Sequence, residues 1–156
     1  MDSKMEITTS RFGKLNVNAE ELISVPKGIL GFENLKKYFI VEKSNLSPFI
    51  WFQSAEEAGV AFPLIDPACF YPDYRIEVDP RELGELNISD VKKVQVYVLV
   101  TVPPGKPEEA TADLMGPILV NGETRLAKQV VLSKSPYSTR YSIFKNGQPQ
   151  RPRSSV

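Results

Sequence analysis

Carboxylates are the side chains of this sequence best suited to acid–base chemistry, because the chain contains no histidine. That absence excludes histidine general bases, serine–histidine–aspartate triads and histidine metal ligands. Two acidic pairs remain, the adjacent Glu56 and Glu57 and the more widely spaced Asp66 and Asp73. Adjacent carboxylates in a turn are usually only solvated. Asp66 and Asp73 would form a hydrolase site only in a concave pocket with their carboxyl groups roughly 5–9.5 Å apart.

Two further features could indicate a metal or phosphate site, but each lacks residues that such a site needs. The single cysteine, Cys69, allows no internal disulfide and no multi-cysteine zinc site, so we expect no metal and no cofactor. Gly28 and Gly31 are spaced as in a phosphate-binding loop, but no Gly-Lys-Ser/Thr follows and no long helix begins behind them. We interpret them as turn glycines and expect a protein that is not an enzyme.

The chain of 156 residues is expected to form one domain, with 42% apolar and 24% charged residues. Apolar runs are shorter than the roughly 18 residues that a membrane-spanning helix needs, so no membrane contact is expected. The opening MDSKMEITTS is polar and lacks the apolar segment of a secretion signal. Together with the lone cysteine, these features predict a cytoplasmic protein.

Charge is unevenly distributed along the chain. The 19 basic and 19 acidic residues cancel overall, but the segment after Ser133 holds five basic residues and no acidic one. The first 132 residues therefore carry a net charge of −5. A basic segment of this kind can bind nucleic acid or an acidic protein surface, or it can simply be solvated.

The elements that position these residues are arranged around the stretch from Gly59 to Asp79, GVAFPLIDPACFYPDYRIEVD. Val60–Ile65 is predicted to be a strand. Nearly all its residues are apolar, so burial of one face alone would leave apolar side chains in water. The strand therefore either lies in the centre of the fold or contacts a partner protein with part of its surface. Pro67 and Pro72 mark a bend, and the alternation over Tyr74–Val78 predicts a second, half-buried strand.

Most of the other elements are also predicted to be short strands. The segment VQVYVLVTV at 94–102 is the strongest of them, and its five valines are assigned to the core. Asp79 as a cap, Pro80 at the first helical position and Glu82 in a capping box predict a short helix, and Glu33–Lys37 is expected to form one helical turn. The remaining strands are expected at 5–9, 15–17, 23–25, 38–41, 49–53, 110–113, 118–120 and 125–132. This pattern predicts an all-β fold, a small closed or barrel-like antiparallel structure with one or two short helices.

An ordered set of segments resembles the family of the flagellar assembly factor FliW. The segments are ITTSRFGKLNV, VPKGILGFENLKKYFIV, GVAFPLIDPACFYPDY, TADLMGPILVN and AKQVVL. They cover about residues 5–133. The chain is therefore divided into a FliW-like β domain at 1–133 and a basic, loosely ordered tail at 134–156. Tyr137, Tyr141 and Phe144 could dock this tail onto the domain.

The resemblance implies a β-rich regulator without enzymatic activity. Members of this family bind CsrA, a small dimeric RNA-binding repressor of flagellin translation, away from its RNA-contact surface, and lower its RNA affinity allosterically. They also bind flagellin in the cytoplasm, which couples flagellin synthesis to export. Direct contact with nucleic acid is not expected under this reading; the alternative is a nucleic-acid-binding β-barrel that uses the basic tail.

By the same resemblance, CsrA contacts are expected on the strand matching Gly59-Val60-Ala61-Phe62 and on a neighbouring strand around Arg75. Arg75 departs from the pattern, because the family carries an acidic residue there. Glu77 or Asp73 could take over that role, or the partner of this chain differs in charge. Val60 and Phe62 could instead be plain core residues. Weaker candidates, each equally consistent with a local hydrogen-bonding role, are Asp66, Asp113 and Asn121.

Overall fold

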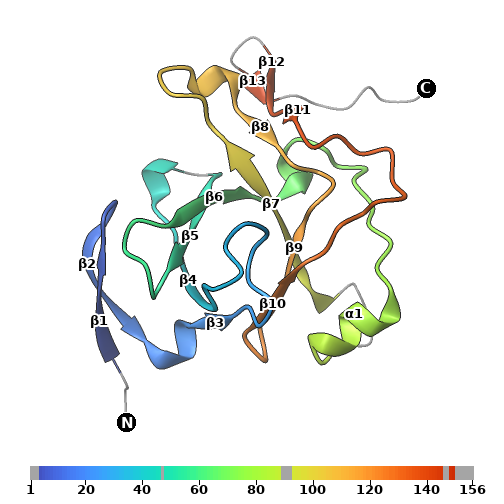
Figure 1. Cartoon of the computed structure of the whole chain (residues 1–156). Helices are drawn as coiled ribbons and strands as arrows, with labels where there is room; N and C mark the ends of the chain where they lie inside the picture. The colour runs from blue at the N-terminus through green and yellow to red at the C-terminus, as the bar shows by residue number, and fades with distance from the viewer. Residues whose placement is uncertain (1–3, 47, 89–92, 146–147, 150–156) are drawn as a thin grey trace.

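Seven strands of the described residues close into a barrel (Figure 1). The computed structural model describes residues 4–46, 48–88, 93–145 and 148–149. Around the barrel the order is β7, β6, β5, β4, β3, β10 and β9, and β9 returns to β7. All neighbours are antiparallel except β3 and β10. The strands are β3 (Ile23–Ser24), β4 (Lys37–Val41), β5 (Ile50–Ser54), β6 (Ala61–Ile65), β7 (Gln95–Thr101), β9 (Ile118–Asn121) and β10 (Leu126–Gln129). The all-β, barrel-like prediction is confirmed.

The barrel interior is filled by side chains from all seven strands. Tyr38 of β4 and Phe52 of β5 stack with their ring centroids 4.5 Å apart and their planes 5° from parallel. Fully buried aliphatic side chains surround the pair, and β7 contributes the partly buried Tyr97 and Leu99. The interior is therefore a packed core and not a ligand cavity.

Strand β7 is covered on both faces, which changes the role predicted for its valines. Tyr97 and Leu99 point into the barrel, whereas Val98 and Val100 are buried in a second core outside it. Val102 is 43% exposed. The valine face is thus a core face up to Val100, but it belongs to the outer layer because the barrel interior takes the alternate residues.

The outer layer over β7 comes from later parts of the chain. β8 (Thr111–Ala112) pairs with the end of β7, and β11 (Tyr141–Ser142) pairs with β8. β12 (Phe144–Lys145) and β13 (Gln148–Pro149) form a separate antiparallel pair. Tyr137, Tyr141 and Phe144 pack against the second core, so the first part of the basic segment docks on the barrel. The division at 133/134 stays a prediction.

An N-terminal hairpin stands against the barrel on the side opposite to α1 (Figure 1). β1 (Lys4–Thr9) pairs with β2 (Gly13–Asn18), as predicted for this segment. Ile7 and Val17 pack against Phe39 and Val41 of β4, whose side chains alternate with the interior Tyr38. The alternation along β4 therefore seats the barrel core on one face and the hairpin on the other.

The only α-helix of the described residues is α1 (Pro80–Glu85), and the predicted cap is confirmed. The Asp79 carboxylate accepts the backbone N–H of Arg81 at 2.8 Å, and Pro80 begins the helix. Glu82 does not complete the predicted capping box, because its carboxylate lies 3.4 Å from Nζ of Lys128 instead. The described residues also include the 3-10 turns η1 (Ala19–Glu21), η2 (Ser44–Leu46), η3 (Pro67–Cys69) and η5 (Pro107–Glu109). The sequence further predicts a turn at 87–91, most of which lies outside the described residues.

Two predicted elements are wrong. Tyr74–Val78 is an extended segment that pairs with no strand of the described residues, although Tyr74, Ile76 and Val78 do alternate with exposed residues. Its period of two arises because alternate side chains pack onto a third hydrophobic core, which includes Leu83 and Leu86 around α1. The backbone of the segment forms no strand pairing with the described residues. Glu33–Lys37 forms no helix either, because residues 33–34 make an isolated turn in which the backbone N–H of Leu35 donates to the carbonyl of Phe32 at 3.1 Å, and β4 begins at Lys37. Among the described residues, no helix has the length and hydropathy to cross a membrane.

Candidate protein-interaction surface

Strand β6 is divided between the core and an open surface. Leu64 is buried inside the barrel and Ile65 in the outer core, and both pair with β7. The ladder to β7 stops there, because Pro63 has no N–H to donate. Ala61–Pro63 has its paired strand on the β5 side alone within the described part of the chain, and all three residues are half-buried. The sequence left two roles open for this run. Leu64 and Ile65 are central in the fold, whereas Ala61–Pro63 is open on one side, and its role as a partner surface stays a prediction.

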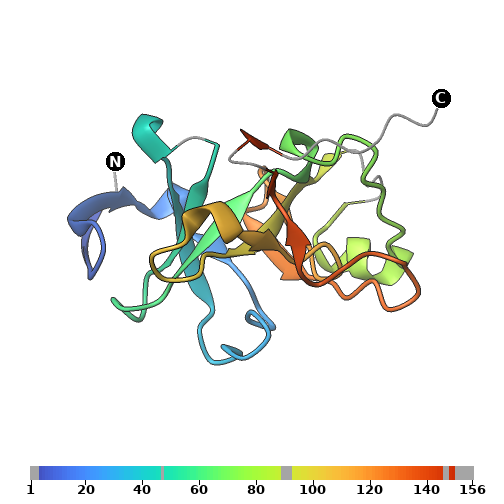
Figure 2. The ribbon, with the colours of Figure 1, turned by 90° about the horizontal axis from the view of Figure 1, so that it is seen from above.

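A loop at residues 26–36, the cap loop, lies across one end of the barrel beside the open half of β6 (Figures 1 and 2). Ile29 inserts its side chain into the barrel core. Gly28 has a φ of +68°, and a Cβ there would lie 2.5 Å from Cα of Glu33, so only glycine fits this turn. Glu56 accepts the backbone N–H of Lys37 at 2.9 Å and ties the end of the loop to the turn before β6. This acidic residue is structural, where sequence reasoning had treated it as solvated.

Apolar side chains project from the cap loop. Phe32 is 39% exposed and meets Phe62 of β6 edge to face, with ring centroids 5.0 Å apart. Leu30, at the tip, is 74% exposed. Phe62 in turn touches the core at Tyr38, with centroids 6.2 Å apart. Sequence reasoning missed Leu30 and Phe32; the signal was a pair of large apolar residues flanked by turn glycines, where polar residues are usual.

The predicted site residues Gly59 and Val60 lie in the turn that leads into β6. Gly59 is exposed and Val60 is half-buried. The carbonyl of Val60 accepts the backbone N–H of Ser54 at 2.9 Å and the side-chain amide of buried Gln53 at 3.1 Å. The turn is therefore held by β5. Phe62 meets the cap loop, whereas Gly59 faces the N-terminal hairpin, where an added Cβ would lie 3.9 Å from Oγ of Ser10.

The predicted site residues Asp73, Arg75 and Glu77 lie elsewhere, and the expected placement beside β6 is wrong. The neighbours of β6 are β5 and β7, while residues 71–79 run along the opposite side of the molecule toward α1 (Figure 1). All three side chains are exposed. Arg75 donates through Nη1 to the carbonyls of Pro72 and Tyr74, at 3.2 and 2.9 Å.

The three weaker candidates, Asp66, Asp113 and Asn121, all make hydrogen bonds within the chain. The Asp66 carboxylate is exposed and accepts the backbone N–H of Ala68 at the start of η3. Asp113 accepts the backbone N–H groups of Met115 and Gly116, at 3.0 and 3.1 Å.

Asn121 is only 4% exposed, at the end of β9. Its amide donates to the carbonyl of Leu86 at 2.7 Å, and its oxygen accepts the backbone N–H of Glu123 at 2.9 Å. Asn121 thus links the barrel to the end of α1, and it offers little surface of its own to a partner.

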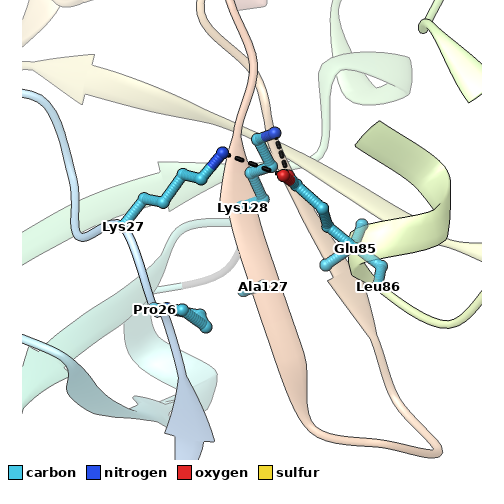
Figure 3. A pocket seen from close by; sticks show the side chains of 6 residues that line it. All are labelled: Pro26, Lys27, Glu85, Leu86, Ala127 and Lys128. Carbon is cyan, nitrogen blue, oxygen red and sulfur yellow. Dashed lines mark hydrogen bonds and ion pairs between the residues drawn. The ribbon is translucent and has the colours of Figure 1, made fainter. Parts of the chain in front are cut away.

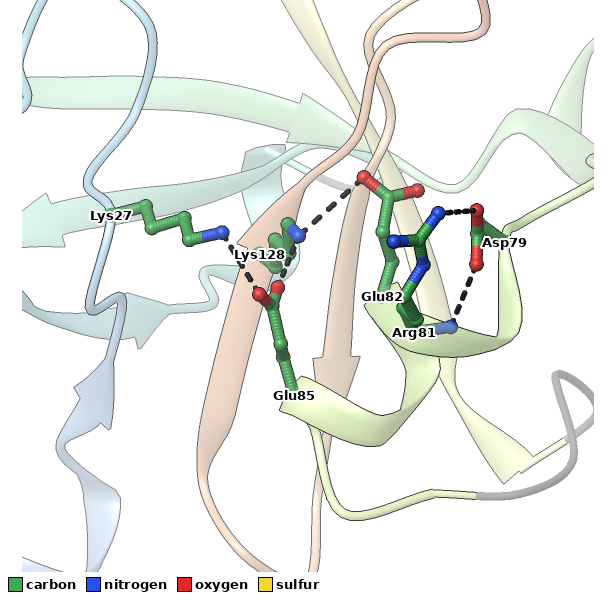
Figure 4. Close-up of polar contacts among 6 residues, drawn as sticks. All are labelled: Lys27, Asp79, Arg81, Glu82, Glu85 and Lys128. Atoms are coloured by element: carbon green, nitrogen blue, oxygen red, sulfur yellow. Dashed lines mark hydrogen bonds and ion pairs between the residues drawn. The ribbon is translucent and has the colours of Figure 1, made fainter.

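A charged cluster fastens α1 to the barrel (Figures 3 and 4). The Glu85 carboxylate accepts from the ammonium groups of Lys27 and Lys128, the former at 2.9 Å. These bonds to Lys128 and Lys27 lower the pKa of Glu85 to about 2. The cluster rims a hollow of about 250 Å³ with an apolar floor that includes Leu86 and Ala127. Its opposite charges form ion pairs with one another, so we assign the cluster a structural role in holding α1 against the barrel.

A larger groove of about 840 Å³ separates residues 71–82 from residues 131–137. The hydroxyl of Tyr137 accepts the backbone N–H of Arg75 at 2.8 Å and joins the two walls. Asp66 and Asp73 line neither this groove nor the smaller hollow. Within the described residues no group of three or more acidic, cysteine or histidine side chains could hold a metal ion. The carboxylate pair considered for hydrolysis therefore lacks a concave site in either hollow.

Comparison with known proteins agrees with this architecture. The model of the family described as FliW protein matches residues 6–143. The flagellar assembly factor FliW of Moorella thermoacetica is 41% identical over 141 residues, which cover 90% of this chain and 89% of the relative. The protein of the same name from Natranaerobius thermophilus is 36% identical over 152 residues, 97% of this chain and 100% of the relative. A crystal structure of the flagellar assembly factor FliW superimposes with a TM-score of 0.84 at 31% identity, covering 91% of this chain and 99% of that chain. This chain therefore belongs to the FliW family, whose named members are flagellar assembly factors.

Proposed function

We propose that this chain acts in flagellar assembly as a cytoplasmic regulator that captures the translational repressor CsrA and also binds flagellin. The proposal rests on membership of the FliW family together with one structural observation. Phe62 is half-buried at the open end of β6, and its ring packs against the exposed Phe32 of the cap loop. A partly exposed pair of aromatic rings on a rigid scaffold is the kind of anchor that dominates protein interfaces.

The surface that we assign to CsrA comprises Gly59, Val60 and Phe62, extended by Leu30 and Phe32. All five side chains are apolar or absent, so contact there gains mainly from removing apolar surface from water. The backbone of the surface is preformed, because Gln53 and Ser54 hold the turn and Ile29 anchors the cap loop. Little ordering is required on binding, which limits the entropic cost of capture.

The charged residues Asp73, Arg75 and Glu77 have a different part in this proposal. They are exposed and lie away from β6, so they act on a basic partner through the field around the protein. Complementary potentials speed association and select partners even where the charges make no contact. The net charge of −5 over residues 1–132 suits an RNA-binding protein as the partner.

Allosteric antagonism requires this protein to bind the RNA-free form of CsrA more tightly than the RNA-bound form. A coupling free energy of about 1–3 kcal/mol would lower RNA affinity roughly 5- to 150-fold. By linkage, RNA lowers the affinity of CsrA for this protein by the same factor. Flagellin reverses the effect if its binding reduces the free pool of this protein, which couples flagellin synthesis to export.

The decisive experiment is a titration of labelled target RNA with CsrA at increasing concentrations of this protein. We expect the apparent dissociation constant for RNA to rise and then to level off, because an allosteric effect saturates at the coupling factor. Addition of flagellin from the same source should restore RNA binding. A constant that climbs without a plateau would show direct competition, and an unchanged constant would contradict CsrA capture altogether.

A further inference from the structure

The groove between residues 71–82 and 131–137 is not used by the proposed function, and its chemistry is distinctive. Its apolar lining includes Tyr71 and Tyr137 together with Val131, which is 59% exposed, and Pro136. The tyrosine rings meet edge to face with centroids 5.8 Å apart. Grooves lined by aromatic rings are the sites at which extended proline-containing segments dock.

The groove is also acidic along one wall. Glu77, Asp79 and Glu82 line it from the side of residues 71–82, with Arg75 and Lys134 as the basic residues. Asp79 and Glu82 have ion-pair partners in Arg81 and Lys128. Glu77 is exposed and makes no ion pair with any described residue. The wall therefore offers an uncompensated carboxylate beside tyrosine rings.

The walls are held in place before any ligand arrives. The Tyr137 hydroxyl accepts the backbone N–H of Arg75, and the Tyr74 hydroxyl donates to the carbonyl of Leu114 at 2.5 Å. Burial raises the pKa of Tyr74, so its hydroxyl stays protonated and available as a donor. A ligand entering this groove would not have to order its walls.

The C-terminal sequence of the same chain matches this groove. Residues 148–156 read QPQRPRSSV and contain the spacing Pro149-x-x-Pro152, with Arg151 and Arg153 and no acidic residue. In a polyproline II helix, with three residues per turn, Pro149 and Pro152 share one face and the two arginines lie on the others. Such a segment presents prolines to aromatic rings and guanidinium groups to carboxylates.

The described part of the chain leads to the groove. Pro149 pairs in register with Phe144, and Phe144 packs against the same outer core as Tyr71 and Tyr137. The seven residues that follow Pro149 span at most about 24 Å when extended. The segment thus starts from the outer core onto which the groove tyrosines also pack, with enough length to extend toward the groove.

We propose that residues 150–156 occupy this groove in their own chain, with Pro152 against Tyr71 and Tyr137 and the arginines toward Glu77. The groove is in this view a self-docking site for a basic, proline-containing segment. The assignment does not rest on the contact surface proposed for CsrA, because neither the cap loop nor β6 lines the groove.

Disulfide trapping tests the assignment in the full-length chain. With Cys69 replaced by serine, cysteines at Val131→Cys and Ser154→Cys are exposed to mild oxidation. The matched control is Thr139→Cys with Ser154→Cys, because Thr139 is exposed on the same segment but does not line the groove. We expect the monomeric disulfide to form about tenfold faster in the test pair, since docking raises the local concentration of one thiol near the other.

Charge reversal separates docking from chance collision. Arg151→Glu with Arg153→Glu should slow trapping about two- to fivefold, since exposed ion pairs are individually weak, and Glu77→Lys should restore part of the rate. Equal trapping in the test and control pairs would overturn the proposal. Disulfide-linked dimers in place of monomers would assign the groove to the segment of a second copy and overturn the same-chain assignment.

Discussion

The ring of Phe32 meets the ring of Phe62 edge to face, with centroids 5.0 Å apart and planes at 77°. Phe32 belongs to the cap loop and Phe62 to the open half of β6, thirty residues later in the chain. Phe62 also touches Tyr38 in the barrel core, so its truncation affects folding as well as any surface. Phe32 lies further out, and it is the residue through which the proposed CsrA surface can be tested most cleanly.

Phe32→Ala should weaken capture of CsrA about tenfold, because a partly exposed aromatic anchor typically accounts for more than 1 kcal/mol of binding free energy. The free energy of unfolding should fall by only about 1–2 kcal/mol, the value of one aromatic contact and part of its burial. Binding is measured by calorimetry and stability by urea denaturation. Val131→Ala, an exposed apolar residue in the separate groove, is the control and should retain full affinity. Loss of affinity in both variants would place the contact elsewhere.

Arg75→Glu should raise the association rate with CsrA about two- to threefold at low salt and leave the dissociation rate nearly unchanged. The substitution makes the net charge more negative by two, and a charge outside the contact acts on the encounter rather than on the complex. Stopped-flow binding at two salt concentrations separates the two rates. A tenfold change in the dissociation rate would show that Arg75 touches the partner, against its position away from β6.

Gly28→Ala and Gly31→Ala form a matched pair that tests the cap loop. Both residues have positive φ, +68° and +90°, which costs a residue with a side chain about 1–2 kcal/mol. A Cβ at Gly31 meets nothing within 4 Å, whereas at Gly28 it lies 2.5 Å from backbone of Glu33. Urea denaturation should therefore show a loss of about 1–2 kcal/mol for Gly31→Ala and a larger one, with lost CsrA binding, for Gly28→Ala. Equal losses would mean that the loop relaxes freely.

Glu85 should make stability depend on pH in the acid range. Its hydrogen bonds to Lys128 and Lys27 lower its pKa in the folded protein to about 2, below the value near 4.5 expected for the unfolded chain. The stabilisation is therefore present above pH 4.5 and is lost as the pH falls toward 2. Glu85→Gln should lower the urea midpoint at pH 7 and flatten the fall between pH 5 and pH 2. An unchanged acid profile in the variant would assign the pH dependence to other carboxylates.

Tyr38→Phe should leave the protein as stable or raise the free energy of unfolding by about 1 kcal/mol. The Tyr38 hydroxyl is buried without a hydrogen-bond partner among the described residues, and such a group costs free energy. The stacking on Phe52 does not need the hydroxyl. Burial also raises the pKa of Tyr38 from 10.0 to about 12, so the unfolded chain loses this proton at a lower pH than the folded protein does. The free energy of unfolding of the wild-type protein should therefore fall more steeply than that of the variant as the pH rises from 10 to 12. Marked destabilisation of the variant would reveal a partner for the hydroxyl, such as a buried water.

The sequence by itself determined the class of fold and most of its strands. The short continuous apolar run Tyr38–Val41 predicts a buried strand. The valines at every second position of 94–102 predict another, because side chains of a strand point to opposite faces with a period of two. The cap at Asp79 was also readable, since a capping carboxylate acts on backbone groups only two residues away. The ordered FliW-like segments indicated the family, which the comparisons confirmed.

Only the tertiary structure decided which of those residues form a surface. Tyr74–Val78 has the alternation of a strand, yet the places beside β6 are taken by β5 and β7, so Arg75 is not on a strand next to Phe62. Phe32 and Phe62 are brought together by the closure of the barrel and the folding of the cap loop across its end. Local patterns record which face of a segment is buried, but not which distant segment covers it, because that choice is made by the packing of the whole chain.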